Sequence, residues 1–343
     1  MEFTMGGRLE VRITPADVGR RVSVRRVVDA PGEGAKFTDT VGVLTSWDDD
    51  VLSVTTRSGE SIHIPQSSLV AGKVVPSAPA RRRGPAASFG ELAPVTARAW
   101  QPVESELLGD WRLRAAGGFT RRANSVLPLG DPGLPLGEAL GRVRRWYGDR
   151  GLPARVQAAT GAEGTQERLC ADLEEYGWRR EVSAEVRIAA LAPVGDQDTD
   201  VSAVRTARQP DEAWLSRYQR FETPGPHVLE VLGSGPSVWF ASVPGDGPEG
   251  VPAAIGRCVV DGRWAGFMAV EVGPEHRRRG LATAVMTALA RTALDEGASA
   301  AWLQVESDNE GARALYDGMG FATHHHYHHF RPEAETAAGT CPT

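Results

Sequence analysis

Three consecutive arginines precede a glycine at the start of a long apolar helix pattern. In the stretch "EVGPEHRRRGLATAVMTALARTALDEG", Arg277, Arg278, Arg279 and Gly280 form the turn between a strand-like run and this helix. The first turn of a helix offers unpaired N–H groups and the positive end of the helix dipole, and glycine lets a ligand approach the backbone closely. The pattern predicts a site for an anion such as a pyrophosphate, with an ordinary basic helix start as the alternative.

A second motif lies further along, in "WLQVESDNEGARALYDGMGF". With the two motifs in this order, the chain resembles the GNAT superfamily of acyl-CoA-dependent N-acyltransferases over about residues 200–330. The residues that carry the resemblance are Arg277, Gly280 and Ala282, which fit the loop pattern Gln/Arg-x-x-Gly-x-Gly/Ala, and Asn309, Leu315, Tyr316, Gly320 and Phe321, which fit an Asn before a Leu-Tyr helix that ends in Gly-Phe.

The resemblance implies acetyl-CoA as the co-substrate and no metal cofactor. It implies main-chain contacts from Val272 to the pantetheine arm, and a general-acid role for Tyr316, which would protonate the leaving thiolate. The residues that it assigns to cofactor binding are Val272, Arg277, Arg278, Arg279, Gly280, Leu281, Ala282, Thr283, Asn309 and Ala312. A core tyrosine on an amphipathic helix is the alternative reading of Tyr316.

The general base is harder to assign, because the two positions where relatives often carry a glutamate hold Gly266 and Gln304. Glu271, at the strand end beside Val272, is the first choice for the base, and an ordinary surface carboxylate is an equal alternative. The other substitutes are Glu306, His276 or a water chain. Holding amine and thioester in attack geometry would supply much of the rate.

The rest of the chain must position these groups. Residues 10–75 read as four or five short strands that resemble an SH3-like small β-barrel, and the Pro-, Ala- and Arg-rich residues 76–91 read as a linker. A degenerate GNAT-like domain without the loop is predicted over 92–192, a catalytic GNAT domain over 198–332, and a disordered tail over 333–343. The fold class is therefore α/β, an α+β GNAT fold with a mixed central sheet and flanking helices, preceded by an all-β barrel.

The arrangement of the two GNAT-like halves resembles tandem GNAT enzymes. The piece "VESDN" and the helix after it look like the C-terminal domain of the mycothiol synthase family. The whole layout resembles an actinobacterial group of GNAT proteins sometimes labelled histone acetyltransferase.

Composition narrows the function classes. A net charge of -6 argues against wholesale binding of nucleic acid or anionic membranes. Three distant cysteines form neither a disulfide framework nor a metal pair. No signal core or membrane-length apolar run is present, so a cytoplasmic location is expected, with a homodimer left open.

The most histidine-rich stretch is "THHHYHHF", with five of the eight histidines between His324 and His329. On a strand, His324, His326 and His328 would point one way and His325, Tyr327 and His329 the other. The prediction is a half-exposed strand at a sheet edge or at the junction with the first half, because the family's usual last strand is absent or supplied elsewhere. One imidazole is a further candidate for the missing base.

These observations favour an N-acetyltransferase that moves an acetyl group from acetyl-CoA to a primary amine. The acceptor would be a small-molecule amine or a protein amino group, attacked directly. Two alternatives stay open: a CoA-binding sensor or scaffold without turnover, and a barrel-directed module that binds protein or nucleic acid.

Overall fold

The computed structural model describes residues 10–28, 36–76, 84–218, 225–246 and 250–333. The chain divides into two compact units. The first holds the N-terminal strands together with Ala158–Gly177, and the second holds the remaining described residues.

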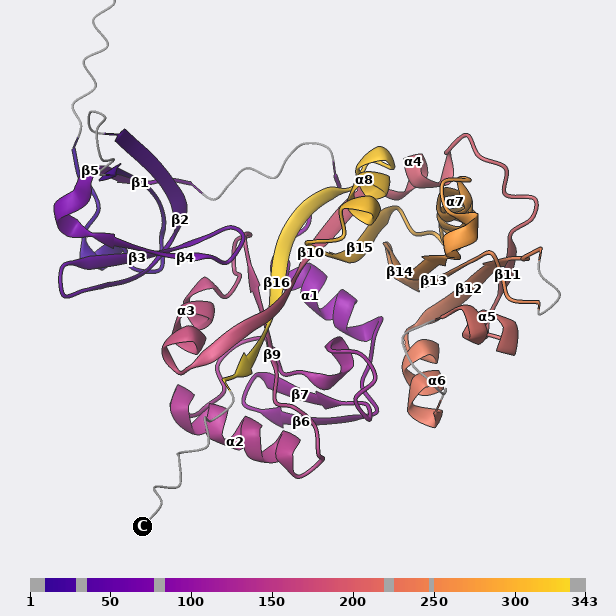
Figure 1. Ribbon diagram of the computed structural model, residues 1–343, viewed down its shortest axis with the longest axis horizontal. Coiled ribbons are helices and arrows are strands. Elements are labelled where there is room, and N and C mark those ends of the chain that lie inside the picture. The colour runs from indigo at the N-terminus through magenta and orange to yellow at the C-terminus, as the bar shows by residue number, and fades with distance from the viewer. Residues whose placement is uncertain (1–9, 29–35, 77–83, 219–224, 247–249, 334–343) are drawn as a thin grey trace, which may run out of the picture. The chain divides into compact units, whose positions relative to one another are not determined.

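The first unit is built on a five-stranded antiparallel sheet of order β4-β3-β2-β1-β5 (Figure 1). Its strands are β1 (Arg21–Val28), β2 (Lys36–Asp48), β3 (Val51–Thr56), β4 (Ser61–Pro65) and β5 (Leu69–Val74), with 3-10 turns η1 (Pro15–Asp17) and η2 (Gln66–Ser68). Its core consists of Ile13, Val22, Val24, Leu44, Leu52, Val54 and Ile64. The predicted small all-β domain is confirmed. The loop predicted before β2 lies mostly outside the described residues.

The second unit begins with helix α1 (Phe89–Arg98), which was not predicted and which includes the last residues of the expected linker. Ser88 caps it by accepting a hydrogen bond from the backbone of Glu91 at 3.1 Å. A three-stranded sheet and helix α2 follow, and the predicted α2 is confirmed. Their bounds are β6 (Glu104–Leu108), β7 (Trp111–Ala115), η3 (Arg122–Asn124), β8 (Leu127–Pro128) and α2 (Leu136–Gly148).

An eight-stranded mixed sheet of order β11-β12-β13-β14-β15-β10-β16-β9 is the main scaffold of the site (Figure 1). Its strands are β9 (Val156–Thr160), β10 (Trp178–Ala190), β11 (Arg205–Ala207), β12 (Ser237–Val243), β13 (Ala254–Asp261), β14 (Trp264–Val272), β15 (Ala300–Glu306) and β16 (Ala322–Pro332). Only β14 and β15 are paired in parallel among the partners whose register is defined. Apart from the short β11, each of these strands was expected from its apolar or alternating pattern.

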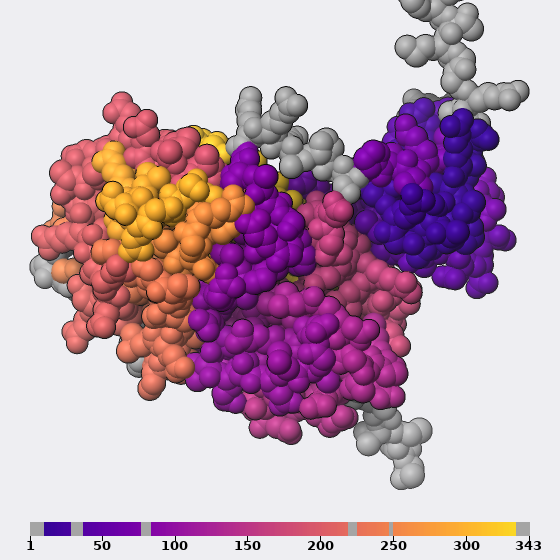
Figure 2. Space-filling view, turned by 180° about the vertical axis from the view of Figure 1, so that it is seen from behind, coloured from indigo at the N-terminus to yellow at the C-terminus, as the bar shows by residue number. Residues whose placement is uncertain are grey.

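The helices between these strands are α3 (Glu167–Glu175), α4 (Leu191–Gly195), α5 (Glu212–Arg217), α6 (Pro226–Gly233), η4 (Pro274–His276), α7 (Leu281–Asp295) and α8 (Glu310–Gly318). Helices α7 and α8 pack on one face of the sheet, where their apolar residues join Leu303 and Val305 of β15 in one core. Helix α1 lies against the β13–β14 hairpin, through Arg98 with Asp261 at 2.7 Å and Glu91 with Arg263 at 2.6 Å. Figure 2 shows this purple segment against the orange surface of the hairpin region.

Strand β10 resolves the question of the missing last strand. It comes from the first predicted half, yet it lies between β15 and β16 and pairs with both of them antiparallel. Strand β16 is therefore an interior strand next to β9, so the predicted sheet edge is wrong, whereas the predicted junction with the first half is found. The proposed boundaries 92–192 and 198–332 stay predictions, and one sheet joins strands from both ranges. The predicted tail lies almost wholly outside the described residues.

Candidate active site

Two neighbouring strands separate in the middle of the large sheet. Strands β14 and β15 pair from Trp264 with Ala300 to Phe267 with Leu303. Beyond these residues, β14 pairs only with β13, and the end of β15 pairs only with β10, among the described strands. The parting leaves main-chain groups of β14 without a strand partner on that side, as an extended ligand would require. Val272, the residue predicted to contact pantetheine, lies on this free stretch.

A bulge in β14 sets which side chains face each way. The register with β13 shifts between Ile255 and Arg257, and Ala269 has a left-handed φ of 51°. After the bulge, Val270 and Val272 pack toward the core beneath α7. Glu271, between them, therefore points to the opposite face of the sheet. The predicted base is thus on the face away from α7 and α8.

The arginine turn has the geometry expected of an anion site. Gly280 adopts φ 78° at the N-cap of α7, and the helix has no side-chain cap. The N–H groups of Leu281, Ala282 and Thr283 have no hydrogen-bond partner among the described residues, because the first bond of the helix runs from Ala284 to Gly280. Arg278 is also left-handed, with φ 62°.

The three arginines of this turn are exposed, but they differ in their partners. Arg279 donates to His276 Nδ1 at 2.9 Å and lies 3.7 Å from Asp246. Arg277 and Arg278 make no ion pair with any residue in the described ranges. Two guanidinium groups without an ion-pair partner among the described residues therefore lie beside the N–H groups of the helix start, and this set fits a pyrophosphate. His276, a substitute for the base in the sequence, is engaged with Arg279.

Tyr316 lies on α8 and is 9 % exposed. Its ring packs in the core that also holds Val305 and Phe321, with the Phe321 ring centroid 6.0 Å away. Its hydroxyl makes no hydrogen bond to any described residue. Burial raises the pKa of Tyr316 to about 12, against a smaller opposing effect of Arg187. The phenol is therefore protonated at neutral pH, which is the state that an acid needs.

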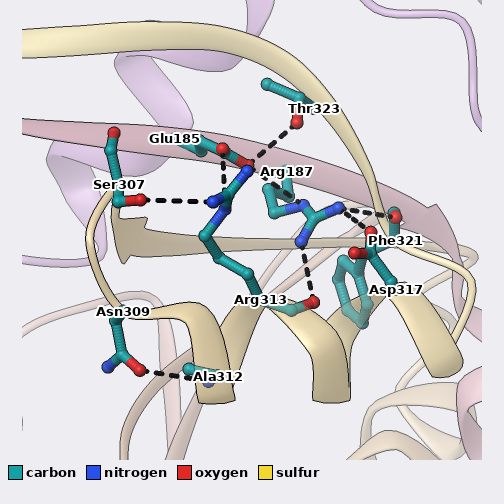
Figure 3. A network of polar contacts seen from close by, with 9 residues as sticks. All are labelled: Glu185, Arg187, Ser307, Asn309, Ala312, Arg313, Asp317, Phe321 and Thr323. Atoms are coloured by element: carbon teal, nitrogen blue, oxygen red, sulfur yellow. Dashed lines mark hydrogen bonds and ion pairs between the residues drawn. The ribbon is translucent and has the colours of Figure 1, made fainter.

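Asn309 and Ala312, both predicted to bind the cofactor, are linked to each other. The side-chain oxygen of Asn309 accepts a hydrogen bond from the backbone N–H of Ala312 at 3.0 Å and so caps α8 (Figure 3). This contact gives Asn309 a structural role, since it fixes the start of the helix that carries Tyr316.

The structure explains why neither Gly266 nor Gln304, the two positions where relatives often carry a glutamate, is an acidic residue. A Cβ on Gly266 would lie 2.4 Å from the indole ring of Trp302, so this ring fills the space of a side chain. Gln304 accepts a hydrogen bond from Nη1 of Arg122, a residue of the first half. Glu306 lies 3.6 Å from Arg121, which also holds it in an ion pair.

A buried charge network anchors α8, and sequence reasoning missed it. Glu185 and Arg187 of β10 are 5 % and 4 % exposed. Arg187 donates to the backbone oxygens of Arg313 and Phe321 and pairs with Asp317, while Glu185 lies 3.0 Å from Nε of Arg313 (Figure 3). The available signal was the pair of charges in the otherwise apolar second half of this strand, "AEVRIAA", because such residues are buried only with partners.

The same network extends to the last strand and to the end of β15. The Thr323 hydroxyl donates to Glu185 at 2.9 Å, and Arg313 donates to the backbone oxygen of Ser307 at 3.3 Å (Figure 3). Contacts from β10, β16 and the end of β15 therefore fix the position of α8. They also fix the position of Tyr316 on this helix.

One face of the histidine strand is buried, whereas His324 and His326 on the other face are half-buried, so the prediction of a half-exposed strand is confirmed for the first half of the strand and wrong at His328. His325, His328 and His329 are 4 %, 0 % and 2 % exposed. His328 bonds the Ser183 hydroxyl at 2.7 Å, and burial lowers its pKa to about 3. Burial also holds the pKa of His329 well below its usual range. Neither is suited to take a proton near pH 7.

Two further features bear on the class of protein. Within the described ranges, no group of three or more His, Cys, Asp or Glu residues could hold a metal ion. No helix in the same part of the chain is long and apolar enough to cross a membrane.

The parted strands, the bulge and the uncapped helix start together are the arrangement of the GNAT acyltransferases, and the chain is an acyltransferase of this type. The family described as "Probable histone acetyltransferase Rv0428c C-terminal" matches residues 87–330, more than half of the chain, and the chain belongs to this family. A second family, "Rv0428c N-terminal Sm-like domain", matches residues 16–73 and corresponds to the barrel expected to be SH3-like.

Two curated relatives and one solved structure agree with this assignment. "Uncharacterized N-acetyltransferase YobR" of Bacillus subtilis is 26% identical over 242 residues, which is 68% of this chain and 95% of the relative. "Probable histone acetyltransferase Rv0428c" of Mycobacterium tuberculosis is 27% identical over 317 residues, 90% of this chain and 93% of the relative. The structure of a GCN5-related N-acetyltransferase from Kribbella flavida shares the fold, with a TM-score of 0.52, 16% identity and coverage of 74% of this chain and 99% of that one.

Proposed function

We propose that the chain transfers an acetyl group from acetyl-CoA to a primary amine by direct attack. The observation that carries the proposal is the start of α7 at Leu281–Thr283, whose N–H groups have no partner among the described residues, as is true of the guanidinium groups of Arg277 and Arg278 beside it. These groups would hold the pyrophosphate of CoA. The main chain of β14 near Val272, which has no strand partner on the side of β15, would hold the pantetheine arm, and the thioester would then lie at the parting of β14 and β15.

The reaction then needs little covalent chemistry from the protein. The neutral amine attacks the thioester carbonyl carbon, a C–N bond forms and the C–S bond breaks, and the sulfur leaves with the electron pair. Backbone N–H groups of the parted strand would stabilise the developing oxyanion. Tyr316, whose hydroxyl is protonated and makes no hydrogen bond to a described residue, would donate to the leaving sulfur.

Glu271 is the group that we assign to the proton lost by the attacking amine. The bulge at Ala269 turns its side chain to the face away from the core of α7 and α8, beyond Met268. From this position Glu271 would take the proton of the amine through one bridging water, since a general base acts either by direct hydrogen bonding or through one water. Glu306 is less suited, since its carboxylate is already engaged in an ion pair with Arg121 at 3.6 Å.

A CoA-binding sensor without turnover is the second candidate, favoured by Trp302 over Gly266 and by the uncharged Gln304. Thiol release over a panel of amines, with calorimetry of acetyl-CoA binding, separates the two. An enzyme should bind acetyl-CoA and release thiol, and Tyr316→Phe should lower kcat by about 100-fold with the acetyl-CoA affinity retained. Binding without release would favour the sensor, and no binding would exclude both.

Tyr147→Phe is the matched control for Tyr316→Phe. Its hydroxyl is also buried, but it donates to the backbone oxygen of Arg114 at 2.9 Å. This change should cost about 1 kcal/mol of stability and leave kcat nearly unchanged.

A further inference from the structure

One loop of the first half lies directly against the parted strands. We call residues Ala116–Asn124 the arginine loop. Asn124 is 1 % exposed and makes four hydrogen bonds within it. Its oxygen accepts from the N–H groups of Ala116 and Gly118 at 2.9 and 3.0 Å, and its amide donates to the carbonyl oxygens of Phe119 and Thr120 at 2.8 Å each. A single buried side chain therefore defines the loop conformation.

The loop also holds a strained residue. Thr120 has a left-handed φ of 58°, which is uncommon for a β-branched residue. Its hydroxyl accepts a hydrogen bond from the indole N–H of Trp100 at 2.9 Å. Such backbone persists only where the surroundings enforce it, and it is concentrated at functional sites. The contacts of the arginine loop therefore hold it in a conformation that its backbone alone would not favour.

Arg122 is the residue of the arginine loop that contacts the parted strands. Its guanidinium donates to Gln304 and stacks on Trp100, 4.8 Å from the ring centroid. Gln304 is the first residue of β15 beyond the last pair with β14. It points away from Leu303 and Val305, which face α7 and α8. Arg122 therefore lies at the mouth of the parting, on the same face of the sheet as Glu271.

Arg122 belongs to a group of arginines that lack an acidic partner. Arg257 is fully buried and donates to the backbone oxygens of Leu232, Ala99 and Ser234, with its guanidinium 5.0 Å from the Trp100 ring. Arg114 is 4 % exposed and donates to Ser125 and Gln157. No carboxylate pairs with Arg114, Arg122 or Arg257 in the part of the chain that the structure describes.

The positive charges near Trp100 oppose one another. Burial, with a smaller contribution from the charge of Arg122, lowers the pKa of Arg257 to about 9 and that of Arg114 to about 10. The neighbouring Arg121 and Arg155 differ, because both pair with Glu181. The chain carries 44 acidic residues, so carboxylates were not scarce. Among the described residues, Arg122 therefore lies at the mouth without a carboxylate partner, whereas its neighbour Arg121 is paired.

We infer that the acceptor amine carries a carboxylate, and that Arg122 binds this carboxylate in place of its hydrogen bond to Gln304. The inference rests on the proposed acetyl transfer and specifies its substrate class. Guanidinium binds carboxylate through two parallel N–H···O bonds, which are stronger than its bond to a neutral amide. A glutamate at position 304 would pair with Arg122 and remove this affinity, which gives the neutral Gln304 a purpose. A polyamine, which has no carboxylate, would lack this contact.

Thiol release from the full chain with matched acceptors tests the inference. We compare β-alanine with β-alaninamide, and L-phenylalanine with L-phenylalaninamide. The amides hold more of their amine in the neutral, reactive form, so amine ionisation cannot produce a preference for the acids. The acids should have a kcat/KM about tenfold or more above that of the amides. Phosphoethanolamine against ethanolamine tests whether a phosphate replaces the carboxylate.

Two substitutions test whether Arg122 and Gln304 cause the preference for acids. Arg122→Gln should raise the KM for the acids, so that acids and amides have about the same kcat/KM, while the KM for acetyl-CoA stays unchanged. Gln304→Glu should produce the same loss while Arg122 stays in place, and it serves if Arg122→Gln does not fold. Arg121→Gln, from the same loop but with its charge already paired, is the control and should keep the preference.

The outcomes separate the two proposals. Turnover that is equal for acids and amides, or faster for amides and polyamines, overturns the inference while the acetyl transfer stands. A preference for phosphoethanolamine over every carboxylate also overturns it. Failure of all amines, together with no binding of acetyl-CoA, contradicts the proposed function itself.

Discussion

The indole ring of Trp302 on β15 occupies the space in which a side chain on Gly266 of β14 would begin. The two residues are directly paired in the parallel part of the sheet, and a Cβ on Gly266 would lie 2.4 Å from the ring. Trp302 is 1 % exposed, so its ring is enclosed by other protein atoms. The closed space explains why this position, where relatives often carry a glutamate, holds glycine.

The first prediction follows from this contact. Gly266→Ala should destabilise the chain by about 1–3 kcal/mol, because the added methyl group overpacks a filled core. Urea denaturation measures the change. Gly148→Ala, at the open end of α2, is the control and should be neutral or slightly stabilising. A neutral Gly266→Ala would show that Trp302 can move, and that an acid could be installed at 266.

The second prediction concerns the arginine turn before α7. The double change Arg277→Gln and Arg278→Gln should raise the Kd for acetyl-CoA about tenfold at low salt, because two unpaired charges are lost beside the free N–H groups. The difference should shrink in 0.5 M salt, since both groups are exposed and screened. Arg145→Gln on the exposed side of α2 should change nothing. An unchanged Kd in the double variant would remove these residues from the cofactor site.

Local sequence patterns predicted the arginine turn, the helix after it and the helix that carries Tyr316, because each of these features depends on residues close together in the chain. The polar contacts that surround Tyr316 and the mouth of the parted strands could not be predicted in this way. Arg122 and Gln304 are far apart in the sequence, as are Arg187 and Asp317. Strand β10 read as the end of the first half, since its apolar alternation gives no information about which strands lie beside it.

The third prediction concerns the network that anchors α8. Arg187→Met should destabilise the chain by about 3–5 kcal/mol, because it leaves the buried Glu185 with fewer positive partners. Urea denaturation measures this loss. Arg179→Met is the control on the same strand, since its pair with Glu333 is exposed, and it should change stability by no more than about 0.5 kcal/mol.

The same variant also tests the position of Tyr316. If the network holds α8 in place, the folded fraction of Arg187→Met should have a lower kcat, because Tyr316 would no longer be held in the position that the proposed proton transfer requires. A folded variant with the kcat of the wild-type chain would restrict Glu185 and Arg187 to stability.

The fourth prediction is a loss of stability in acid that depends on His328. In the unfolded chain this imidazole binds a proton near pH 6.5, whereas in the folded chain its pKa is about 3, because burial and then the charges of Arg180 and His326 oppose protonation. Between these two values the unfolded state binds more protons, so stability is full above pH 6.5 and falls as the pH decreases toward 3. The loss reaches about 2 kcal/mol by pH 5.

Urea denaturation of the second unit at pH 7.5, 6 and 5 measures this slope. His328→Gln, which can still bond the Ser183 hydroxyl, should have a shallower slope than the wild-type chain, with the remainder coming from His329 in the same direction. His227→Gln, on the partly exposed first turn of α6, is the control and should keep the wild-type slope. Equal slopes in His328→Gln and the wild-type chain would mean that the buried imidazole takes up a proton as easily as an unfolded one, and the packed histidine strand would then not be a source of acid sensitivity.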